Sequence, residues 1–411
     1  MSGMSLEDGS SLKAVCKRRE LYAAVQAVGH AVTGRSPVQI LSNILFKTQE
    51  NGLKLIATDM ELSISCLVPA VIESPGEMTT PAKTLADALA NLPESSEVAL
   101  SVDRSFTTLV HCDRSDFKMI GLPAAEYPRL PDLEEPVSIE QSRSVLNESV
   151  SYTVPQSVLK DMVRQTMFAV SKESARVVLT GLFLEYNDGV LRMVATDTHR
   201  LAVRTVHLSN GSGSRSAILP ARTATELLRF LSDAPGDVDV RLASNRIAFT
   251  LPGPEKMEIV SSVIEGQYPN YARVIPAESS KRLVVNTQQL TQAARRALTV
   301  STDSSMSFRV IISSSPGLME VSAQNPLVGS VRAELDVEHS GGAIEIAFNG
   351  KYLVDALNAV ETENVALDLT ESLKPGVVRP VADPASQEEG NSDPVSLQSD
   401  YLCVIMPMQI A

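Results

Sequence analysis

The stretch that decides the fold is LRMVATDTHRLAVRT, from Leu191 to Thr205. Apolar and polar residues alternate on both sides of a short polar tip, a pattern typical of two strands joined by a tight turn. A similar stretch, LKLIATDMELSISC, begins at Leu53, and a third, LMEVSAQNPLVGSVRAEL, begins at Leu318. The spacing of about 130 residues is far longer than a solenoid repeat and suits a whole domain. We therefore expect three similar domains.

The same three segments accompany each hairpin in the same order. A helix with apolar residues three and four apart precedes it, as KRRELYAAVQAVGHAV, PQSVLKDMVRQTMFAV and NTQQLTQAARRALTV. A strand that runs into a second helix follows it, as MTTPAKTLADALANL, AILPARTATELLRFL and IEIAFNGKYLVDALNAV. A proline-marked segment ends the repeat, as EYPRLPDL, QYPNYARVIP and YLCVIMPMQIA. Each repeat is predicted to be a mixed sheet with two helices, so the expected fold class is α+β.

Polar or proline-rich runs separate the repeats. One extends over residues 132–151, and a shorter one lies around residues 278–281. The predicted domains are therefore an N-terminal, a central and a C-terminal one, over residues 12–134, 150–277 and 281–411. A further run, ADPASQEEGNSDPVSLQSD at residues 382–400, precedes the last strand. Its Pro, Ser, Gly and acidic residues favour a surface loop inserted within the third domain.

The composition favours a protein of a reducing compartment. The 411 residues include four cysteines that are far apart and form no CxxC pair, which argues against a disulfide framework or a zinc knuckle. The N-terminal stretch MSGMSLEDGSS has no apolar signal core, and no segment approaches the roughly 20 apolar residues of a membrane span. We expect a cytoplasmic protein that makes no membrane contact. Its cores should be aliphatic, because Trp is absent and aromatic residues make up 4%.

Positive charge is concentrated around the first helix of each repeat, although the whole chain has a net charge of −13. That net charge alone argues against nucleic acid, because Lys and Arg drive phosphate binding. Two interpretations stay open: the basic residues solvate exposed helix faces, or they form one electrostatic surface for DNA. The residues that would form this surface are Arg18, Arg19, Arg35, Lys172, Arg176, Arg295 and Arg296. No motif predicts base-specific readout, so any contact would be with phosphates.

The motifs of common enzyme classes are missing from the sequence. It contains no GxxxxGK[ST], GxSxG, HExxH or helix-opening GxGxxG, and its histidines are scattered. Asp197 and His199 could belong to an acid/base pair of a hydrolase or transferase. The first repeat, however, has Asp59 at the same place without a His, so turn capping explains the aspartate better. We expect a protein that is not an enzyme and holds neither a cofactor nor a metal.

Several separated motifs together resemble one known family. They are the threefold repeat itself, ATDTHRLAV, QYPNYARV and VIMPM, with the stretches LPAAEYPRLP, VLTGLFLE and GRSPVQILSNIL. In this order they resemble the bacterial replicative sliding clamps, the β subunits of DNA polymerase III. The resemblance extends from about Leu12 to Ile410, nearly the whole chain.

The resemblance implies a processivity factor, a head-to-tail homodimeric ring that encircles duplex DNA with helices lining the hole. It also implies the absence of a catalytic residue. The implied partners are double-stranded DNA, the DNA polymerase III α subunit, the δ subunit of the clamp loader, and other polymerases and repair proteins that dock through short peptides. A scaffold that binds proteins and never meets DNA stays open as an alternative.

In the family, such peptides bind between the second and third domains. We call the matching residues the candidate groove: Leu179, Thr196, His199, Arg200, Leu201, Pro269, Val274, Val404, Met406, Pro407 and Met408. Its Leu, Val, Pro and Met side chains would form an adaptable apolar surface, with His199 and Arg200 as a polar rim. Two residues depart from the family pattern. Thr198 stands where Gly is usual and Gln409 where a cationic residue is common, which bears on the preferred peptide.

The resemblance also suggests where two subunits meet and where DNA is held. Phe117 of the first domain would pack near Thr299 and Val300 of the partner subunit. Arg35 matches a position that the family uses for DNA. Val177 and Val178 stand where larger polar or aromatic residues can occur, so that patch would contribute less.

Overall fold

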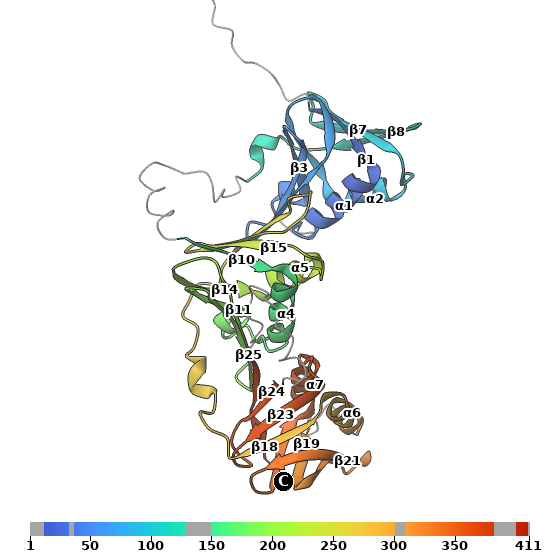
Figure 1. Ribbon diagram of the computed structural model, residues 1–411. Helices are drawn as coiled ribbons and strands as arrows, with labels where there is room; N and C mark the ends of the chain where they lie inside the picture. The colour runs from blue at the N-terminus through green and yellow to red at the C-terminus, as the bar shows by residue number, and fades with distance from the viewer. Residues whose placement is uncertain (1–11, 33–36, 129–148, 301–308, 382–399, 410–411) are drawn as a thin grey trace, which may run out of the picture. The chain divides into compact units, whose positions relative to one another are not determined.

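The computed structural model describes residues 12–32, 37–128, 149–300, 309–381 and 400–409 (Figure 1). Arg35 and most of the 382–400 run, both singled out in the sequence, lie outside these ranges. The chain divides into two compact units. One unit contains residues 1–157 and 229–263, and the other contains residues 158–228 and 264–411. The central repeat therefore contributes strands to both units.

In the first unit, two helices of the first repeat pack on each other. They are α1 (Arg18–Gly29) and α2 (Ala82–Ala90), and α1 also contacts β3 (Gly52–Thr58) and β4 (Leu62–Val68). The apolar residues of α1 recur three and four apart, which places them on one face of the helix. The buried ones are Leu21, Ala24, Val25, Ala27 and Val28. This face covers the sheet as the sequence pattern predicts.

The first unit contains two antiparallel sheets. The five-stranded sheet has the order β5-β1-β7-β8-β9, with the bounds Ala70–Ser74, Lys13–Lys17, Glu97–Val102, Thr107–Cys112 and Ser115–Ile120. The eight-stranded sheet has the order β10-β15-β16-β17-β4-β3-β2-β6. Its strands not yet given are Val150–Pro155, Asp237–Leu242, Arg246–Thr250, Glu258–Ser262, Asn43–Gln49 and Glu77–Pro81. Because β17 pairs with β4, with Ile259 opposite Ile64, one sheet continues from the first repeat into the central one.

The second unit contains a single thirteen-stranded antiparallel sheet. The central repeat supplies β14 (Ser214–Pro220), β11 (Gly181–Asn187), β12 (Val190–Thr196) and β13 (Arg200–His207). The third repeat continues it in the order β25-β24-β23-β18-β21-β20-β19-β22-β26. Their bounds are Asp400–Ile405, Gly376–Val381, Asn364–Leu369, Lys281–Asn286, Gly329–Ser340, Gly317–Asn325, Arg309–Ser315, Ile344–Asn349 and Pro407–Met408. The two repeats are joined where β13 pairs with β25.

The helices of the central and third repeats follow the predicted positions. They are α4 (Gln156–Met167), α5 (Ala221–Phe230), α6 (Thr287–Leu298) and α7 (Gly350–Asn358). Asparagine caps the last two: the side chain of Asn286 accepts from the Gln289 N–H, and that of Asn349 accepts from the Lys351 and Tyr352 N–H groups. α6 and α7 pack on each other over an aliphatic core that includes Leu283, Leu290, Leu353 and Leu357.

The predicted α+β class is confirmed, with two helices for each repeat among the described residues. All three predicted hairpins are present, as β3–β4, β12–β13 and β20–β21. The expectation of mixed sheets is wrong, because each described strand pairing is antiparallel. For the hairpins the reason is the short connection: a tight turn can join only antiparallel neighbours, whereas a parallel pair needs a long crossover.

The four cysteines are free and buried. Burial, the largest effect, raises the pKa of the Cys16, Cys66 and Cys403 thiols to about 12. Since the thiolate is the reactive form, these three thiols are inert at neutral pH and act as small apolar core groups. Among the described residues, no helix combines the length and apolar character needed to cross a membrane.

Candidate functional site

The tip of the β12–β13 hairpin is a turn closed by its own side chains. Asp197 Oδ1 accepts from the N–H groups of His199 and Arg200, both at 3.0 Å. Thr196 Oγ1 donates to the Arg200 carbonyl at 2.7 Å. Asp59 makes the same pair of bonds in the first repeat, from the Glu61 and Leu62 N–H groups. The turn-capping interpretation of these aspartates is therefore confirmed.

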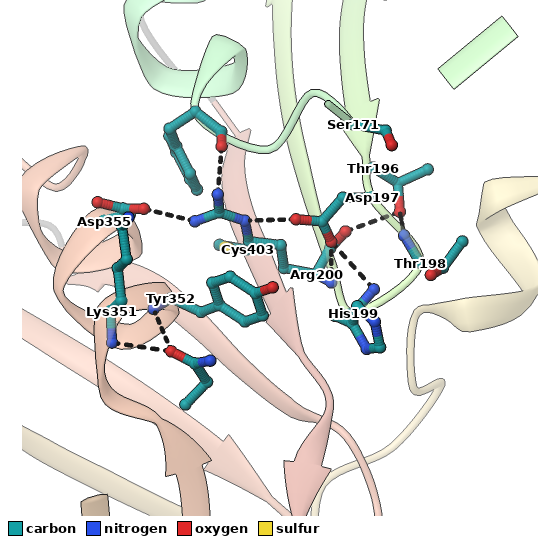
Figure 2. A network of polar contacts seen from close by, with 12 residues as sticks. Ser171, Thr196, Asp197, Thr198, His199, Arg200, Lys351, Tyr352, Asp355 and Cys403 are labelled. Carbon is teal, nitrogen blue, oxygen red and sulfur yellow. Dashed lines mark hydrogen bonds and ion pairs between the residues drawn. The ribbon is translucent and has the colours of Figure 1, made fainter. Parts of the chain in front are cut away.

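Arg200 lies just after this tip, and its guanidinium is enclosed by groups of its own chain (Figure 2). Its Nε donates to Asp197 Oδ2 at 3.0 Å, and its Nη1 donates to Asp355 Oδ2 on α7 at 2.6 Å. Its Nη2 donates to the carbonyl of Phe168, just beyond α4. Because both Asp197 oxygens are used in this way, Asp197 does not orient the His199 ring for acid/base chemistry.

Two aromatic rings complete the surroundings of Arg200. Its guanidinium carbon lies 4.3 Å from the centre of the Tyr352 ring and 5.2 Å from that of Phe168. The exposed His199 ring stacks on the Tyr352 ring. The two ring centroids are 6.3 Å apart, with 23° between the ring planes. Burial, the largest effect, raises the pKa of the Tyr352 hydroxyl, and the nearby Asp197 carboxylate adds to it. Tyr352 therefore stays a neutral hydrogen-bonding group near the hairpin tip.

Three apolar members of the candidate groove meet in one cluster. Leu179, Leu201 and Val404 are buried together with Tyr268 and the strand residues around them. Leu201 on β13 lies opposite Val404 on β25, so the pairing of two repeats brings these side chains together. Leu179 comes from η3 (Val177–Leu179), a short turn before β11. Residues far apart in the sequence thus share one apolar floor.

The remaining apolar residues of the candidate groove are exposed or partly exposed. Met406, Pro407 and Met408 are partly exposed, and the Met406 N–H donates to the His199 carbonyl at 2.9 Å. Pro269 is exposed, as is Val274 in the short helix η4 (Tyr271–Val274). Exposed apolar side chains beside a buried apolar floor are the arrangement expected of a binding surface for an apolar peptide.

The predicted DNA-contacting residues are mostly exposed. Arg19 on α1 and Arg295 and Arg296 on α6 face solvent, as do Lys172 and Arg176 in the segment between α4 and η3. Arg19 approaches Glu94 at 3.6 Å, and Arg295 donates to the Asn358 side chain at 2.8 Å. Such exposed contacts are weak and would give way to a phosphate group.

Arg18 differs from the other basic residues of this set. Only 8% of it is exposed, and its Nε donates to the Leu89 carbonyl at 2.6 Å. Its guanidinium carbon also lies 4.6 Å from the centre of the Tyr22 ring. Arg18 thus joins α1 to α2. Its contact with DNA stays a prediction, and the exposed Arg19 is better placed for such a contact. The sequence could not separate these two neighbours, because both are arginines in the first turn of one helix.

The residues predicted at the subunit contact lie at open positions of their own units. Phe117 is partly buried on β9, which is an edge strand of the five-stranded sheet. Thr299 is exposed directly after α6, and Val300 packs against the core of the third repeat. An edge strand offers unpaired backbone groups to another chain. The contact itself stays a prediction.

Comparison with models of known families shows the family to which the chain belongs. Models of three successive domains of the DNA polymerase III beta subunit match the chain: the N-terminal domain over residues 12–131, the central domain over 153–270 and the C-terminal domain over 272–389. The chain belongs to the DNA polymerase III beta subunit family. The resemblance seen in the sequence motifs is thereby confirmed.

Individual beta subunits match over nearly their whole length. The Beta sliding clamp of Escherichia coli (strain K12) is 32% identical over 363 residues, covering 88% of this chain and 94% of the relative. That of Pseudomonas aeruginosa is 31% identical over 396 residues, covering 96% and 99%. The solved sliding clamp of Bacillus subtilis gives a TM-score of 0.86 at 26% identity, covering 98% of this chain and 100% of the other. The DnaN clamp of P. aeruginosa bound to griselimycin gives 0.83 at 30%, with coverage of 98% and 100%.

As a beta subunit, the protein is a sliding clamp, a non-catalytic processivity factor of DNA polymerase III. The hydrolase alternative built on Asp197 and His199 is therefore wrong, in agreement with the structural use of Asp197 in the turn. Among the described residues, no cluster of His, Cys, Asp and Glu suits a metal ion.

Thr198, which departs from the family pattern, occupies a conformation suited to glycine. Its φ is +76°, in the left-handed region that β-branched residues rarely adopt. We expect Thr198→Gly to stabilise the protein by about 1 kcal/mol, because relief of this strain exceeds the extra entropy of an unfolded glycine. The midpoint of urea unfolding should rise. Thr180→Gly, at an ordinary φ of −84°, is the control and should lower that midpoint. A lower midpoint for both variants would contradict the strain at Thr198.

Sequence reasoning missed three residues of this beta-subunit site. Phe168, Tyr352 and Asp355 surround Arg200, yet none was singled out from the sequence. The helix that carries Tyr352 and Asp355 was predicted, and their spacing of three places both on one face of it. A signal was therefore present, but nothing in the sequence showed that this face meets the β12–β13 tip.

Proposed function

We propose that this sliding clamp forms a head-to-tail homodimeric ring around duplex DNA and holds DNA polymerase III α, the clamp-loader δ subunit and other polymerases and repair proteins there. The threefold repeat carries this proposal, because the first helix of each repeat lies in a segment that bears exposed basic residues. The proposed domains keep the bounds 12–134, 150–277 and 281–411. We place the protein in the cytoplasm, where such DNA and partners are found.

Ring closure is supported by an open edge in the first repeat. β9 pairs only with β8 among the described strands, so its other side is available to a partner. A contact between unlike surfaces of two identical chains forms a closed ring when its rotation completes a circle. Phe117 on β9 would then pack near Thr299 and Val300 of the partner subunit.

The ring should be a stable dimer in solution. Light scattering should give a mass twice the 44.2 kDa of one chain at micromolar concentration. Phe117→Asp should shift the protein to the monomer, because it places a charge in an apolar contact. The matched control is Val71→Asp on β5, the opposite edge of the same sheet, where Val71 is 69% exposed. A monomeric wild type, or equal dissociation of both variants, would contradict the proposed contact.

The proposed DNA surface consists of the exposed basic residues Arg19, Lys172, Arg176, Arg295 and Arg296, with Arg18 and Arg35 as further candidates. Two of them, Arg295 and Arg296, lie in the last turn of α6, and no acidic residue occurs in that helix. Lys and Arg side chains of this kind neutralise phosphates without reading bases. The proposed contact is therefore independent of sequence and sensitive to salt, which suits a protein that slides.

The proposed docking site for partners is the candidate groove. Its buried floor of Leu179, Leu201 and Val404 can take an apolar anchor, and the partly exposed Met406 and Met408 can adjust to different anchors because methionine is flexible. The exposed His199 offers a polar group at the rim. These features favour an extended client peptide with one or two apolar side chains and one polar side chain.

A further inference from the structure

We propose that Arg200 is a positioning residue of the client site: it fixes the β12–β13 tip against α7 and does not itself contact the client peptide. This inference rests on the proposed docking function of the candidate groove. It changes the part that the sequence assigned to Arg200, which was a donor at the polar rim. His199 then remains as the side chain of this tip that faces the client.

The first support is that the guanidinium of Arg200 already binds groups of its own chain. All three of its nitrogens donate to groups of the same chain, namely Asp197, Asp355 and the Phe168 carbonyl. The Phe168 and Tyr352 rings lie within stacking distance of it, and only 8% of the residue is exposed. These bonds use three of its five N–H groups, and the low exposure of the residue leaves a client carboxylate or carbonyl little access to the other two.

The second support is what Arg200 joins. Asp197 belongs to the hairpin tip of the central repeat, Phe168 follows the last residue of α4, and Asp355 belongs to α7 of the third repeat. The neighbouring residue His199 also binds the third repeat, because its carbonyl accepts from the Met406 N–H at 2.9 Å. The tip is therefore tied to the third repeat twice. Both ties bear on groove residues, His199 and Met406.

The third support is the charge balance. Asp197 and Asp355 present two carboxylates to the one guanidinium, and the side chain of Asp197 is 14% exposed and that of Asp355 is 28% exposed. Without Arg200 these like charges would be left facing one another in a partly dry place, and the tip would move away from α7. Such a movement would carry the His199 ring away from its stack on Tyr352.

The experiment compares peptide affinity in a double-mutant cycle between Arg200 and Asp355. The probe is a fluorescein-labelled peptide that copies the C-terminal tail of the polymerase α subunit from the same organism, measured by fluorescence anisotropy with the full-length clamp. Asp355→Asn and Arg200→Met should each weaken binding about tenfold, as residues that act through the structure do. The double variant should bind no more weakly than Arg200→Met alone, because both changes break one contact.

A direct client contact gives a different pattern. In that case Asp355→Asn leaves the affinity unchanged, and the effects of the two changes add. Arg200→Lys is the second variant, because it keeps the positive charge but cannot reach Asp197, Asp355 and Phe168 together. It should bind as weakly as Asp355→Asn, whereas retained affinity would show that the charge alone meets the client and would overturn the positioning role.

A matched control separates positioning from general loosening of the junction. Arg164 on α4 pairs with Glu361 after α7, so it joins the same two repeats, but 39% and 58% of the two side chains are exposed. Glu361→Gln should leave the affinity unchanged, and a loss equal to that of Asp355→Asn would overturn the specific role of Arg200. If the wild-type clamp does not bind the peptide, the proposed docking site is wrong. If the wild type binds and Asp355→Asn binds equally well, the docking site stands and only the positioning role of Arg200 is wrong.

Discussion

After loading, the protein will stay on a closed circular duplex and leave the same duplex once a single cut has made it linear. The physical reason is the charge of the chain. A net charge of −13 leaves little overall attraction to DNA, so the exposed Lys and Arg residues supply only a weak, salt-sensitive contact. Retention must then come from enclosure. We expect the bound fraction on circles to exceed that on linear DNA by at least about tenfold at physiological salt, where phosphate contacts are weak.

The measurement is gel filtration of labelled protein after loading by the clamp loader with ATP. Blocking both ends of the linear duplex with bulky groups should restore retention, because the ring can no longer slide off. The ring-opening variant Phe117→Asp should be lost from every template, whereas Val71→Asp should behave as the wild type. Equal retention on circular and open-ended linear DNA would mean that direct phosphate binding, and not enclosure, holds the protein.

Replacement of Leu179 and Met406 together by Ala will abolish binding of the polymerase-tail peptide while the dimer persists. Leu179 is 2% exposed in the groove floor, and Met406 is partly exposed directly after β25, the strand that carries Val404 of the same floor. Removing both side chains deletes the apolar surface that would hold the anchor of the peptide, and interface side chains that hold such an anchor carry most of the binding energy. The peptide affinity should fall below detection in the anisotropy assay.

Because the Leu179 change also removes a core side chain, the control must impose the same chemistry elsewhere. Leu53→Ala with Met78→Ala removes a buried Leu and a buried Met from the first repeat, in the other compact unit. This control should lower the unfolding temperature and keep the peptide affinity. Peptide binding that survives the Leu179 and Met406 changes, in protein that is folded and dimeric, would remove the groove assignment.

The sequence predicted the local structure well because local patterns determine it. The alternation on both sides of Thr196–Arg200 is a property of that stretch alone, and so is the capping role of Asp197. The pairings of β17 with β4 and of β13 with β25 were not predicted. The residue pattern of a strand with two buried faces does not identify the strand with which it pairs. That pairing depends on which sheet edges the rest of the chain leaves open.

In the candidate site, too, the sequence identified individual residues but not the contacts between distant segments. Leu201 and Val404 were named through family motifs, and the structure places them side by side because β13 pairs with β25. The sequence could not reveal that Arg18 turns inward to Leu89 or that Arg200 meets Asp355, since exposure and partners of a long side chain depend on distant segments. The roles of these two arginines could therefore not be predicted from the sequence.

A ribosome makes β13 long before it makes β25. About 200 residues separate His207 from Asp400, which at typical elongation rates is on the order of 10–40 s of synthesis. During that time β13 has β12 on one side and no native neighbour on the other. An unpaired edge of this kind invites pairing with a second nascent chain on the same messenger. Slow translation between these strands should therefore lower the yield of native protein, even though β25 covers most of that edge in the finished molecule.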